Sequence, residues 1–377
     1  MKKSAVIALL AALAVGMYSC SKSSDSTPAT VSVVLPQTVH QYYADNTNNI
    51  NEKATVGRVL FYDGHLSLNN AISCGSCHKQ ALAFADNVSL STGYENRLTK
   101  RNSMPIQDLV ASSGPHPFEK GMLTSAGGGS FLFWDGRENN VQNLIARPIT
   151  NHVEMGISDM SVLPAKLSAL PYYSKLFTDA YGTSEITKDK ISECIAYFIS
   201  SIKTGNSRYE LSVIRKTVLT AQEQEGMLLF QNKFMCNSCH NSISFDTSSG
   251  GMNNGYTSMD FMDNGLDDSY TDMGQGTITG NATDNGKFKA PKLHNIALTA
   301  PYMHDGRYKT LDEVLEHYSH NIRNTPNLDI RLRDQANQPR NMNMTNDEKQ
   351  AIIAFLNTLT DTKMITETSF SNPFRAN

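Results

Sequence analysis

Two copies of the pattern Cys-x-x-Cys-His constrain this chain more than any other feature of its 377 residues. One copy occupies residues 74–78 and the other occupies residues 236–240. In this pattern two thiols can attach the vinyl groups of a haem, and the adjacent histidine can supply an axial nitrogen to the iron. A composition with 6 Cys and 10 His predicts roughly 0.0025 copies by chance. The motifs therefore predict two covalently attached c-type haems.

Zinc sites and disulfides are the two chemical alternatives for these cysteines. Pairs of the form Cys-x-x-Cys also hold tetrahedral zinc, and cysteines of exported chains also form disulfides. Neither alternative requires a histidine directly after the second cysteine, so haem attachment is favoured. The predicted attachment residues are Cys74, Cys77, His78, Cys236, Cys239 and His240.

The first 20 residues have the pattern of an export signal. A short basic start precedes an apolar run over residues 5–17, which is too short to span a bilayer as a mature helix. Cys20 directly follows a small residue after that run, which favours a lipoprotein with a lipidated Cys20 over plain secretion. Residues 21–37 are rich in Ser and Thr and predict a flexible tether. We therefore expect a lipid-anchored protein on the periplasmic side of the envelope, at the outer membrane.

A weak internal repeat predicts two related domains. Residues 52–78 and 223–240 share a glutamate, a glycine and a Leu-Phe pair, in the same order before the Cys-x-x-Cys-His motif. The predicted fold is mainly α-helical, with two cytochrome c-like domains that each carry one covalent haem. We expect the N-terminal domain over residues 38–215, the C-terminal domain over residues 216–365, and a loose tail over residues 366–377.

Local patterns place several elements of these domains. Apolar residues at helical spacing over residues 191–202 predict an amphipathic helix that closes the first domain, with Cys194 as a buried core thiol. Thr220 and Thr345 each begin a capping box, which predicts helix starts in the second domain. Residues 248–287 are rich in Gly, Asn, Asp and Thr and predict a long irregular segment with short strands or turns at most.

The charge balance argues against nucleic acid as a partner. The chain has 33 Lys and Arg against 36 Asp and Glu, a formal net charge of -3. It therefore has no excess of basic side chains with which to neutralise a phosphate backbone.

Taken together, the motifs resemble those of the bacterial diheme cytochrome c peroxidase family, which includes MauG-type enzymes. The resemblance covers nearly all of residues 50–362. The matching segments are, in chain order, residues 57–63, 74–78, 100–103, 133–137, 148–149, 154–156, 236–240, 288–291 and 298–306.

The resemblance implies a role for each haem. The first, with proximal His78, would react with peroxide, and the second, with proximal His240, would receive electrons. Trp134 would lie between the haems as a relay. Glu154 would take a proton from one peroxide oxygen and return it to the other, a task that suits a carboxyl group whose pKa is raised by burial.

The resemblance also implies a calcium ion between the domains and often a homodimer. The calcium ligands would be Asn102, Thr299 and the carbonyl oxygen of Pro301, which are oxygen donors of the kind that calcium prefers. His304 would face the second haem as a structural or electron-path residue.

The sequence departs from the family at both iron sites. Tyr94 stands where many of these peroxidases have a histidine that caps the first iron, which suggests an iron that is open without prior reduction. His116 remains an alternative cap. Tyr318 stands where the family has an axial methionine on the second iron, and the resemblance implies that the MauG-type enzyme also has a tyrosine at this position. The alternative ligands there are Met303, His317 and Met342.

Two further departures affect polar contacts. Leu144 replaces a glutamine that assists the reaction with peroxide in the family, so Glu154 would have fewer polar neighbours. His294 replaces an arginine, which would weaken or replace a contact to a haem propionate.

We therefore expect reduction of hydrogen peroxide to water. The electrons would come from a small reduced c-type cytochrome or similar carrier and pass from the C-terminal haem to the N-terminal haem. The alternatives are a MauG-type oxidase that acts on a protein substrate and a diheme electron-transfer protein without turnover.

Overall fold

The computed structural model describes residues 32–33, 50–109, 131–240 and 261–375. Within these residues the chain is mainly helical, as predicted. Cys20, most of the predicted tether and His116 lie outside the described residues. None of the described helices combines the length and apolar character needed to cross a membrane.

Helices make up most of the described chain. The α-helices are α1 (Ile50–Tyr62), α2 (Cys74–Cys77), α3 (Val141–Thr150), α4 (Leu163–Ser168), α5 (Pro171–Tyr181), α6 (Lys188–Ser201), α7 (Arg208–Val213), α8 (Ala221–Leu228), α9 (Gly276–Thr279), α10 (Leu311–His320), α11 (Asn346–Asn357) and α12 (Thr362–Thr366). A π-helical turn, Leu229–Lys233, continues α8. Short 3₁₀ turns lie at Gly64–Leu66, Gln80–Leu82, Tyr94–Asn96, Met160–Val162, Cys236–Ser238, Ala282–Asp284, Ile296–Leu298, Ile330–Leu332 and Thr368–Phe370.

Two short antiparallel strand pairs complete the described elements. Strand β1 (Ser32–Val33) pairs with β4 (Phe374–Arg375), and β2 (Phe261–Met262) pairs with β3 (Phe288–Lys289). Between β2 and β3 the chain forms only α9 and one 3₁₀ turn. This confirms the expected irregular segment for residues 261–287, except that α9 is a short helix where only strands or turns were expected.

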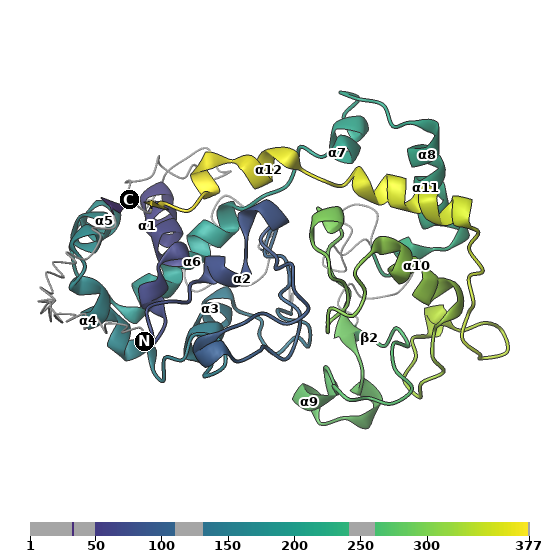
Figure 1. The fold of residues 1–377 in the computed structure, drawn as a ribbon, viewed down its shortest axis with the longest axis horizontal. Coiled ribbons are helices and arrows are strands. Elements are labelled where there is room, and N and C mark those ends of the chain that lie inside the picture. The colour runs from purple at the N-terminus through teal and green to yellow at the C-terminus, as the bar shows by residue number, and fades with distance from the viewer. Residues whose placement is uncertain (1–31, 34–49, 110–130, 241–260, 376–377) are drawn as a thin grey trace, which may run out of the picture.

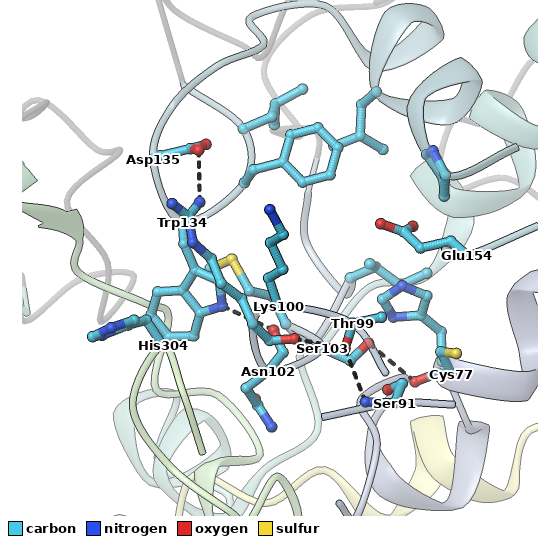
Figure 2. Close-up of a pocket in the computed structure, with 18 of the residues that line it drawn as sticks. Cys77, Ser91, Thr99, Lys100, Asn102, Ser103, Trp134, Asp135, Glu154 and His304 are labelled. Carbon is cyan, nitrogen blue, oxygen red and sulfur yellow. Dashed lines mark hydrogen bonds and ion pairs between the residues drawn. The ribbon is translucent and has the colours of Figure 1, made fainter. Parts of the chain in front are cut away.

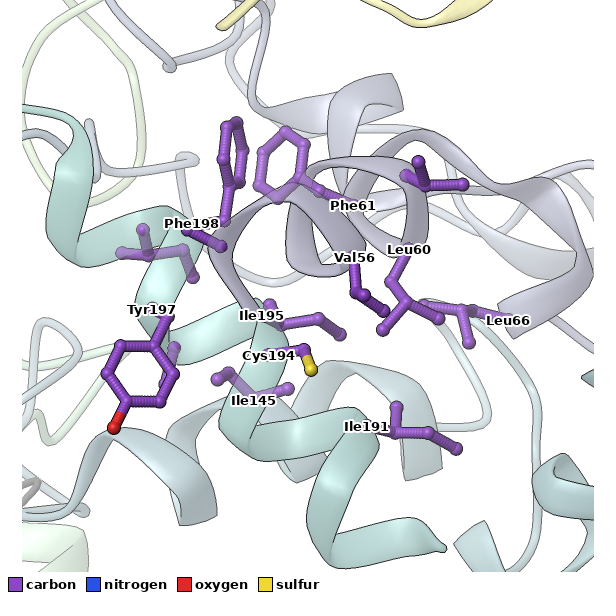
Figure 3. Packing of buried hydrophobic residues seen from close by; sticks show 14 of the residues in the cluster. Val56, Leu60, Phe61, Leu66, Ile145, Ile191, Cys194, Ile195, Tyr197 and Phe198 are labelled. Atoms are coloured by element: carbon purple, nitrogen blue, oxygen red, sulfur yellow. The ribbon is translucent and has the colours of Figure 1, made fainter. Parts of the chain in front are cut away.

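The first hydrophobic cluster forms around the contact between α1 and α6 (Figure 3). The predicted stripe on α6 is buried, and Cys194 is fully enclosed, with its sulfur 3.4 Å from the hydroxyl of Tyr181. Gly57 lets the two helices approach closely, because a Cβ at this position would lie 1.9 Å from the carbonyl oxygen of Cys194. Cys194 is therefore a core thiol, as predicted.

The second hydrophobic cluster repeats this arrangement with α8 and α11. A Cβ on Gly226 of α8 would lie 1.9 Å from the carbonyl oxygen of Ala351 in α11. The glycine of the sequence repeat therefore permits a close helix contact in each half. Both predicted capping boxes are present, on Thr220 at α8 and on Thr345 at α11.

The second cluster draws in residues from before the predicted domain boundary at residue 216. Tyr209 of α7 packs on Phe355 of α11, with ring centroids 5.7 Å apart. The switch from the first cluster to the second therefore takes place between α6 and α7.

The expectation of a loose C-terminal tail is wrong for the described residues. Figure 1 shows α12 leading from the second half back to the first. Phe370 packs against Phe84 and Phe198 and is only 8% exposed. The carbonyl oxygens of Phe370 and Ser371 accept hydrogen bonds from Tyr62 and Arg58 of α1. The tail is ordered because its apolar side chains complete the first cluster, although they are too widely spaced to form a periodic pattern.

Candidate active site

In the first Cys-x-x-Cys-His motif, the histidine ring is oriented as expected for an iron ligand. Cys74 to Cys77 form α2, and Nδ1 of His78 donates a 2.8 Å hydrogen bond to the carbonyl oxygen of Phe84. This bond fixes the ring with Nε2 as the nitrogen for a metal, a second partner that is typical of histidine ligands, and the backbone of Met104 is a further hydrogen-bond partner of the ring. Burial lowers the pKa of His78, which favours the neutral ring that ligation requires.

The second motif has the same arrangement. Nδ1 of His240 lies 3.0 Å from the carbonyl oxygen of Pro291, to which it donates. Cys236 and the ring of Tyr318 pack together against the second cluster. The two motifs therefore fit proximal histidine ligands of two haems.

The described residues do not favour the zinc and disulfide alternatives. The cysteines of both motifs are free thiols. In the described part of the chain, no group of three or more His, Cys, Asp and Glu side chains could hold a metal ion. Neither motif therefore has the tetrahedral ligand set of a structural zinc site there.

A cavity of about 1030 Å³ extends from the first motif to the segment that contains His304. This volume is at the upper end of the range of about 300–1,000 Å³ that is typical of ligand and cofactor pockets. Figure 2 shows Glu154 on one side of this cavity and Trp134 with His304 on the other. The cavity therefore brings together, beside the first motif, the residues that the sequence analysis singled out for catalysis.

Glu154 is a half-buried carboxyl group on the wall of this cavity. Its Oε1 accepts a 2.7 Å hydrogen bond from Nδ2 of Asn151. Burial raises the pKa of Glu154, and Arg137 and Asn151 oppose this effect. The carboxyl group is also close enough to Cys74 and Cys77 to raise the pKa of each thiol. A carboxyl group with a raised pKa beside the first motif fits an acid and base.

Tyr94, at the position of the family's capping histidine, packs against the segment that carries Glu154. Its backbone N–H donates a 2.8 Å bond to the carbonyl oxygen of Glu154, and its ring lies against Gly156. A Cβ on Gly93 would lie 2.2 Å from the carbonyl oxygen of Val153. The turn at Gly93 and Tyr94 therefore positions Glu154, a role that sequence reasoning missed.

Trp134 lies between the two halves of the protein, and the peptide groups of Asn102 connect it to His304. The indole Nε1 of Trp134 donates to the carbonyl oxygen of Asn102 (2.9 Å), and the N–H of Asn102 donates to the carbonyl oxygen of His304 (2.8 Å). The N–H of Lys289 in β3 donates to the carbonyl oxygen of Trp134. Trp134 is therefore fixed by both halves.

The loops that carry Trp134 and His304 have the same conformation. In both, an antiparallel bridge closes the loop, Leu132 with Glu138 and Tyr302 with Tyr308. Both loops have positive φ at the residue before the ring and at the glycine two residues after it. Trp134 and His304 are therefore equivalent positions of the two halves, which the sequence repeat did not reveal.

Beside Trp134 and His304, Arg101 forms ion pairs with two aspartates. It binds both carboxylate oxygens of Asp272 (2.7 and 2.8 Å) and one of Asp135 (2.6 Å). Its guanidinium also lies over the ring of Phe288, which stacks on His304 with centroids 3.8 Å apart. Arg101 therefore links the Trp134 loop to the surroundings of His304.

Lys100 is the cavity-lining cation best placed for an anionic group. Five Lys and Arg side chains line the cavity, and Lys100 projects into it (Figure 2). Among the described residues it is the one of these five without a hydrogen-bond or ion-pair partner. Its ammonium group could pair with a haem propionate.

The candidate ligands of the second iron gather around Asn264. Nδ2 of Asn264 donates to the Tyr318 hydroxyl (3.3 Å) and to the sulfur of Met303 (3.6 Å). Nε2 of His317 donates to the Asn264 carbonyl oxygen (3.0 Å), so this nitrogen is already engaged. Met342 packs beside Tyr318. Cys236 and Cys239 raise the pKa of Tyr318 beyond the effect of burial, so the phenol lies near the second motif.

The predicted calcium ligands are Asn102, Thr299 and the carbonyl oxygen of Pro301. Asn102 and Thr299 are both buried, and Asn102 is hydrogen-bonded to the segment that follows Pro301. Nδ2 of Asn102 donates to the carbonyl oxygens of Val88 and Ser89. The hydroxyl of Thr299 donates to the Ile296 carbonyl oxygen. Both side chains therefore use their donors within the protein and keep oxygen lone pairs for a cation, which fits calcium.

The two residues that depart from the family lie in different surroundings. Leu144 lines the cavity and packs against the first cluster, so it adds no polar group near Glu154. His294 lies between the carboxylates of Asp108 (3.6 Å) and Glu210 (3.5 Å). The structure thus gives His294 carboxylate partners in place of the propionate contact of the family's arginine.

The chain is similar to proteins of known type over most of its length. Residues 51–217 match the family described as di-haem cytochrome c peroxidase. The cytochrome c551 peroxidase of Nitrosomonas europaea is 31% identical over 310 residues, which cover 82% of this chain and 80% of that protein. The methylamine utilization protein MauG of Methylorubrum extorquens is 28% identical over 322 residues, which cover 82% of this chain and 78% of that protein.

A solved structure also has the same fold. It is that of a MauG-like protein associated with microbial copper homeostasis, with a TM-score of 0.74 and 29% identity. The match covers 91% of this chain and 99% of that one.

Proposed function

The chain belongs to the di-haem cytochrome c peroxidase family and is an oxidoreductase of the peroxidase type, and we propose that it reduces hydrogen peroxide to water with electrons from a small c-type cytochrome or similar carrier. The observation that carries the proposal is the position of Glu154, a carboxyl group of raised pKa on the cavity wall beside the first motif.

Two haems would be held by the two motifs. Cys74 and Cys77 would attach the first haem and His78 would ligate its iron, while Cys236, Cys239 and His240 would hold the second. When bound, the haems supply the redox centres for the two-electron reduction of peroxide. The overall reaction takes up two electrons and two protons for each peroxide and releases two waters.

The protein's own contribution to the reaction is proton movement by Glu154. As a carboxylate, Glu154 accepts the proton of the peroxide oxygen that faces the first haem site. As an acid, it then returns that proton to the other peroxide oxygen, which leaves as water. Asn151 donates to Oε1 and keeps the carboxyl group oriented. Without a glutamine at Leu144, this orientation depends on Asn151 and on the turn at Gly93 and Tyr94.

Trp134 is the proposed electron relay from the C-terminal haem to the N-terminal haem. Its indole donates to the carbonyl oxygen of Asn102, its own carbonyl oxygen accepts from the N–H of Lys289 in the second half, and the residue lines the cavity. A fixed aromatic ring between two redox centres needs little rearrangement when an electron passes.

Several parts of the proposal rest on the sequence and the family. We propose calcium at Asn102, Thr299 and Pro301, a lipid anchor at Cys20, a location on the periplasmic side of the outer membrane, and a homodimer. The fit of the Asn102 and Thr299 oxygens supports the first of these.

A second candidate function is oxidation of a protein substrate, as in MauG-type enzymes. Two observations favour it: the 28% identity to a MauG protein, and the phenol of Tyr318 close to the second motif. The two functions differ in their electron source, since the peroxidase consumes a reduced carrier and the oxidase withdraws electrons from the substrate protein.

Replacement of Glu154 tests the proposed function. Glu154→Gln should leave both haems attached and slow peroxide-dependent oxidation of a reduced c-type cytochrome by about 10²–10⁴-fold. Glu225→Gln changes an exposed carboxylate on α8, away from the cavity, and is the matched control, with rates expected to stay unchanged. Wild-type rates in the Glu154→Gln protein would contradict the proposed role.

A further inference from the structure

The side-chain amide of Asn264 contacts two of the four candidate ligands of the second iron. Nδ2 of Asn264 lies 3.3 Å from the hydroxyl oxygen of Tyr318 and 3.6 Å from the sulfur of Met303. An amide nitrogen has two N–H groups, so it can donate to both acceptors at the same time. The phenol and the thioether are therefore alternatives held at one point.

The backbone around Asn264 is fixed. Its carbonyl oxygen accepts from His317, and the preceding residue, Asp263, is buried. The Asp263 carboxylate accepts hydrogen bonds from the N–H of Gly265 (2.8 Å), the hydroxyl of Tyr270 (2.8 Å) and the hydroxyl of Thr325 (2.6 Å). The amide of Asn264 is thus placed before any ligand binds.

Met303 is held in an unusual backbone conformation. Its φ is 74°, in the left-handed region that residues other than glycine rarely adopt. The bridge between Tyr302 and Tyr308 fixes this turn. Such a conformation persists only where its surroundings determine it, and it keeps the Met303 sulfur near Asn264.

On the basis of the proposed second haem, we propose that Asn264 is a positioning residue that selects the phenol oxygen of Tyr318 over the thioether of Met303 as a ligand of the second iron. Hydrogen bonds to an ionised oxygen are about twice as strong as those between neutral groups. A thioether is only a weak acceptor. The same two N–H groups therefore stabilise an anionic phenolate ligand more than a thioether ligand.

This selection sets the potential of the electron-accepting site. An anionic oxygen ligand favours oxidised iron, whereas a methionine ligand raises the potential. Asn264 thus holds the second haem at a lower potential than Met303 would give.

The test compares variants of Asn264 in the full-length protein with both haems attached. Asn264→Leu has a similar volume but no N–H donor, and Asn264→Gln keeps the amide. Asn327→Leu is the matched control, because it also removes two amide hydrogen bonds, to the carbonyl oxygens of Ala282 and Asn285. The readouts are the phenolate charge-transfer absorption of the oxidised protein and the midpoint potential of the second haem.

We expect Asn264→Leu to lose the phenolate absorption, to gain the absorption of a thioether ligand and to show a higher potential. Adding Met303→Leu should remove the thioether absorption, which separates Met303 from Met342. Asn264→Gln and Asn327→Leu should keep the wild-type spectrum. Retention of the phenolate absorption and of the potential in Asn264→Leu would overturn the proposal, and so would a wild-type protein without that absorption. Peroxide turnover is measured separately, so failure of the peroxidase function would leave these spectra interpretable.

Discussion

The indole Nε1 of Trp134 donates a 2.9 Å hydrogen bond to the carbonyl oxygen of Asn102. The same asparagine donates through its backbone N–H to the carbonyl oxygen of His304. The aromatic ring proposed as the electron relay is therefore fixed to a residue that also contacts the second half of the protein.

Replacement of the relay should uncouple the two haems. We expect Trp134→Phe to preserve haem attachment and to slow electron transfer from the second haem to the first by about tenfold or more, which is ~1.4 kcal/mol of added barrier. Stopped-flow reduction, monitored at each haem, measures this rate. Equal rates in the variant and the wild-type protein would show that electrons take another route.

The raised pKa of Glu154 predicts an acidic limb in the pH profile. Because burial keeps the carboxyl group protonated to a higher pH than an ordinary glutamate, the carboxylate needed as the base is lost as the pH falls through that raised pKa. The value of kcat/KM should therefore decrease on acidification. In the Glu154→Gln protein the residual activity should lack this limb, and a limb that persists would assign it to another group.

The C-terminal segment should contribute to stability. Phe370→Ala removes a buried ring from the first cluster and should lower the free energy of unfolding by about 3–5 kcal/mol. Leu228→Ala changes a side chain that is 53% exposed, and its effect should stay within about 0.5 kcal/mol. Chemical denaturation of both variants checks this. If Phe370→Ala lowered the free energy of unfolding no more than Leu228→Ala does, the C-terminal segment would not be part of the core.

The close contact of α1 and α6 should not tolerate a methyl group at Gly57. A Cβ there would lie 1.9 Å from the Cys194 carbonyl oxygen, so Gly57→Ala should destabilise the protein by at least about 1–3 kcal/mol. Gly205→Ala is the matched control, because a Cβ there meets nothing within 4 Å. Thermal unfolding should separate the two, and equal midpoints would show that the helices can move apart.

The sequence predicted those features that local patterns or fixed motifs determine. These include the helical class, the buried stripe that contains Cys194, the capping boxes at Thr220 and Thr345, and the gathering of Glu154 and Trp134 at the first motif. The helices, the stripe and the capping boxes depend on residue types at short, regular spacing, whereas the positions of Glu154 and Trp134 were implied by the family resemblance.

The remaining features depend on partners that are distant in the chain. Phe370 is ordered by Phe84 and Phe198, and Asn264 meets Tyr318 only after folding. No periodicity or motif encodes such pairs, so sequence reasoning predicted a loose tail and did not single out Asn264. The expected open iron at Tyr94 stays a prediction, although the structure places this tyrosine ring on Gly156.

The most direct test is peroxide-dependent oxidation of a reduced small c-type cytochrome, started with the fully oxidised diheme protein and without prior reductant. We expect turnover from the first seconds, because Tyr94 replaces the capping histidine and Glu154 is in place beside the first motif. Turnover only after reduction by one electron would contradict an open first iron. Absence of turnover in both conditions would contradict the peroxidase function itself.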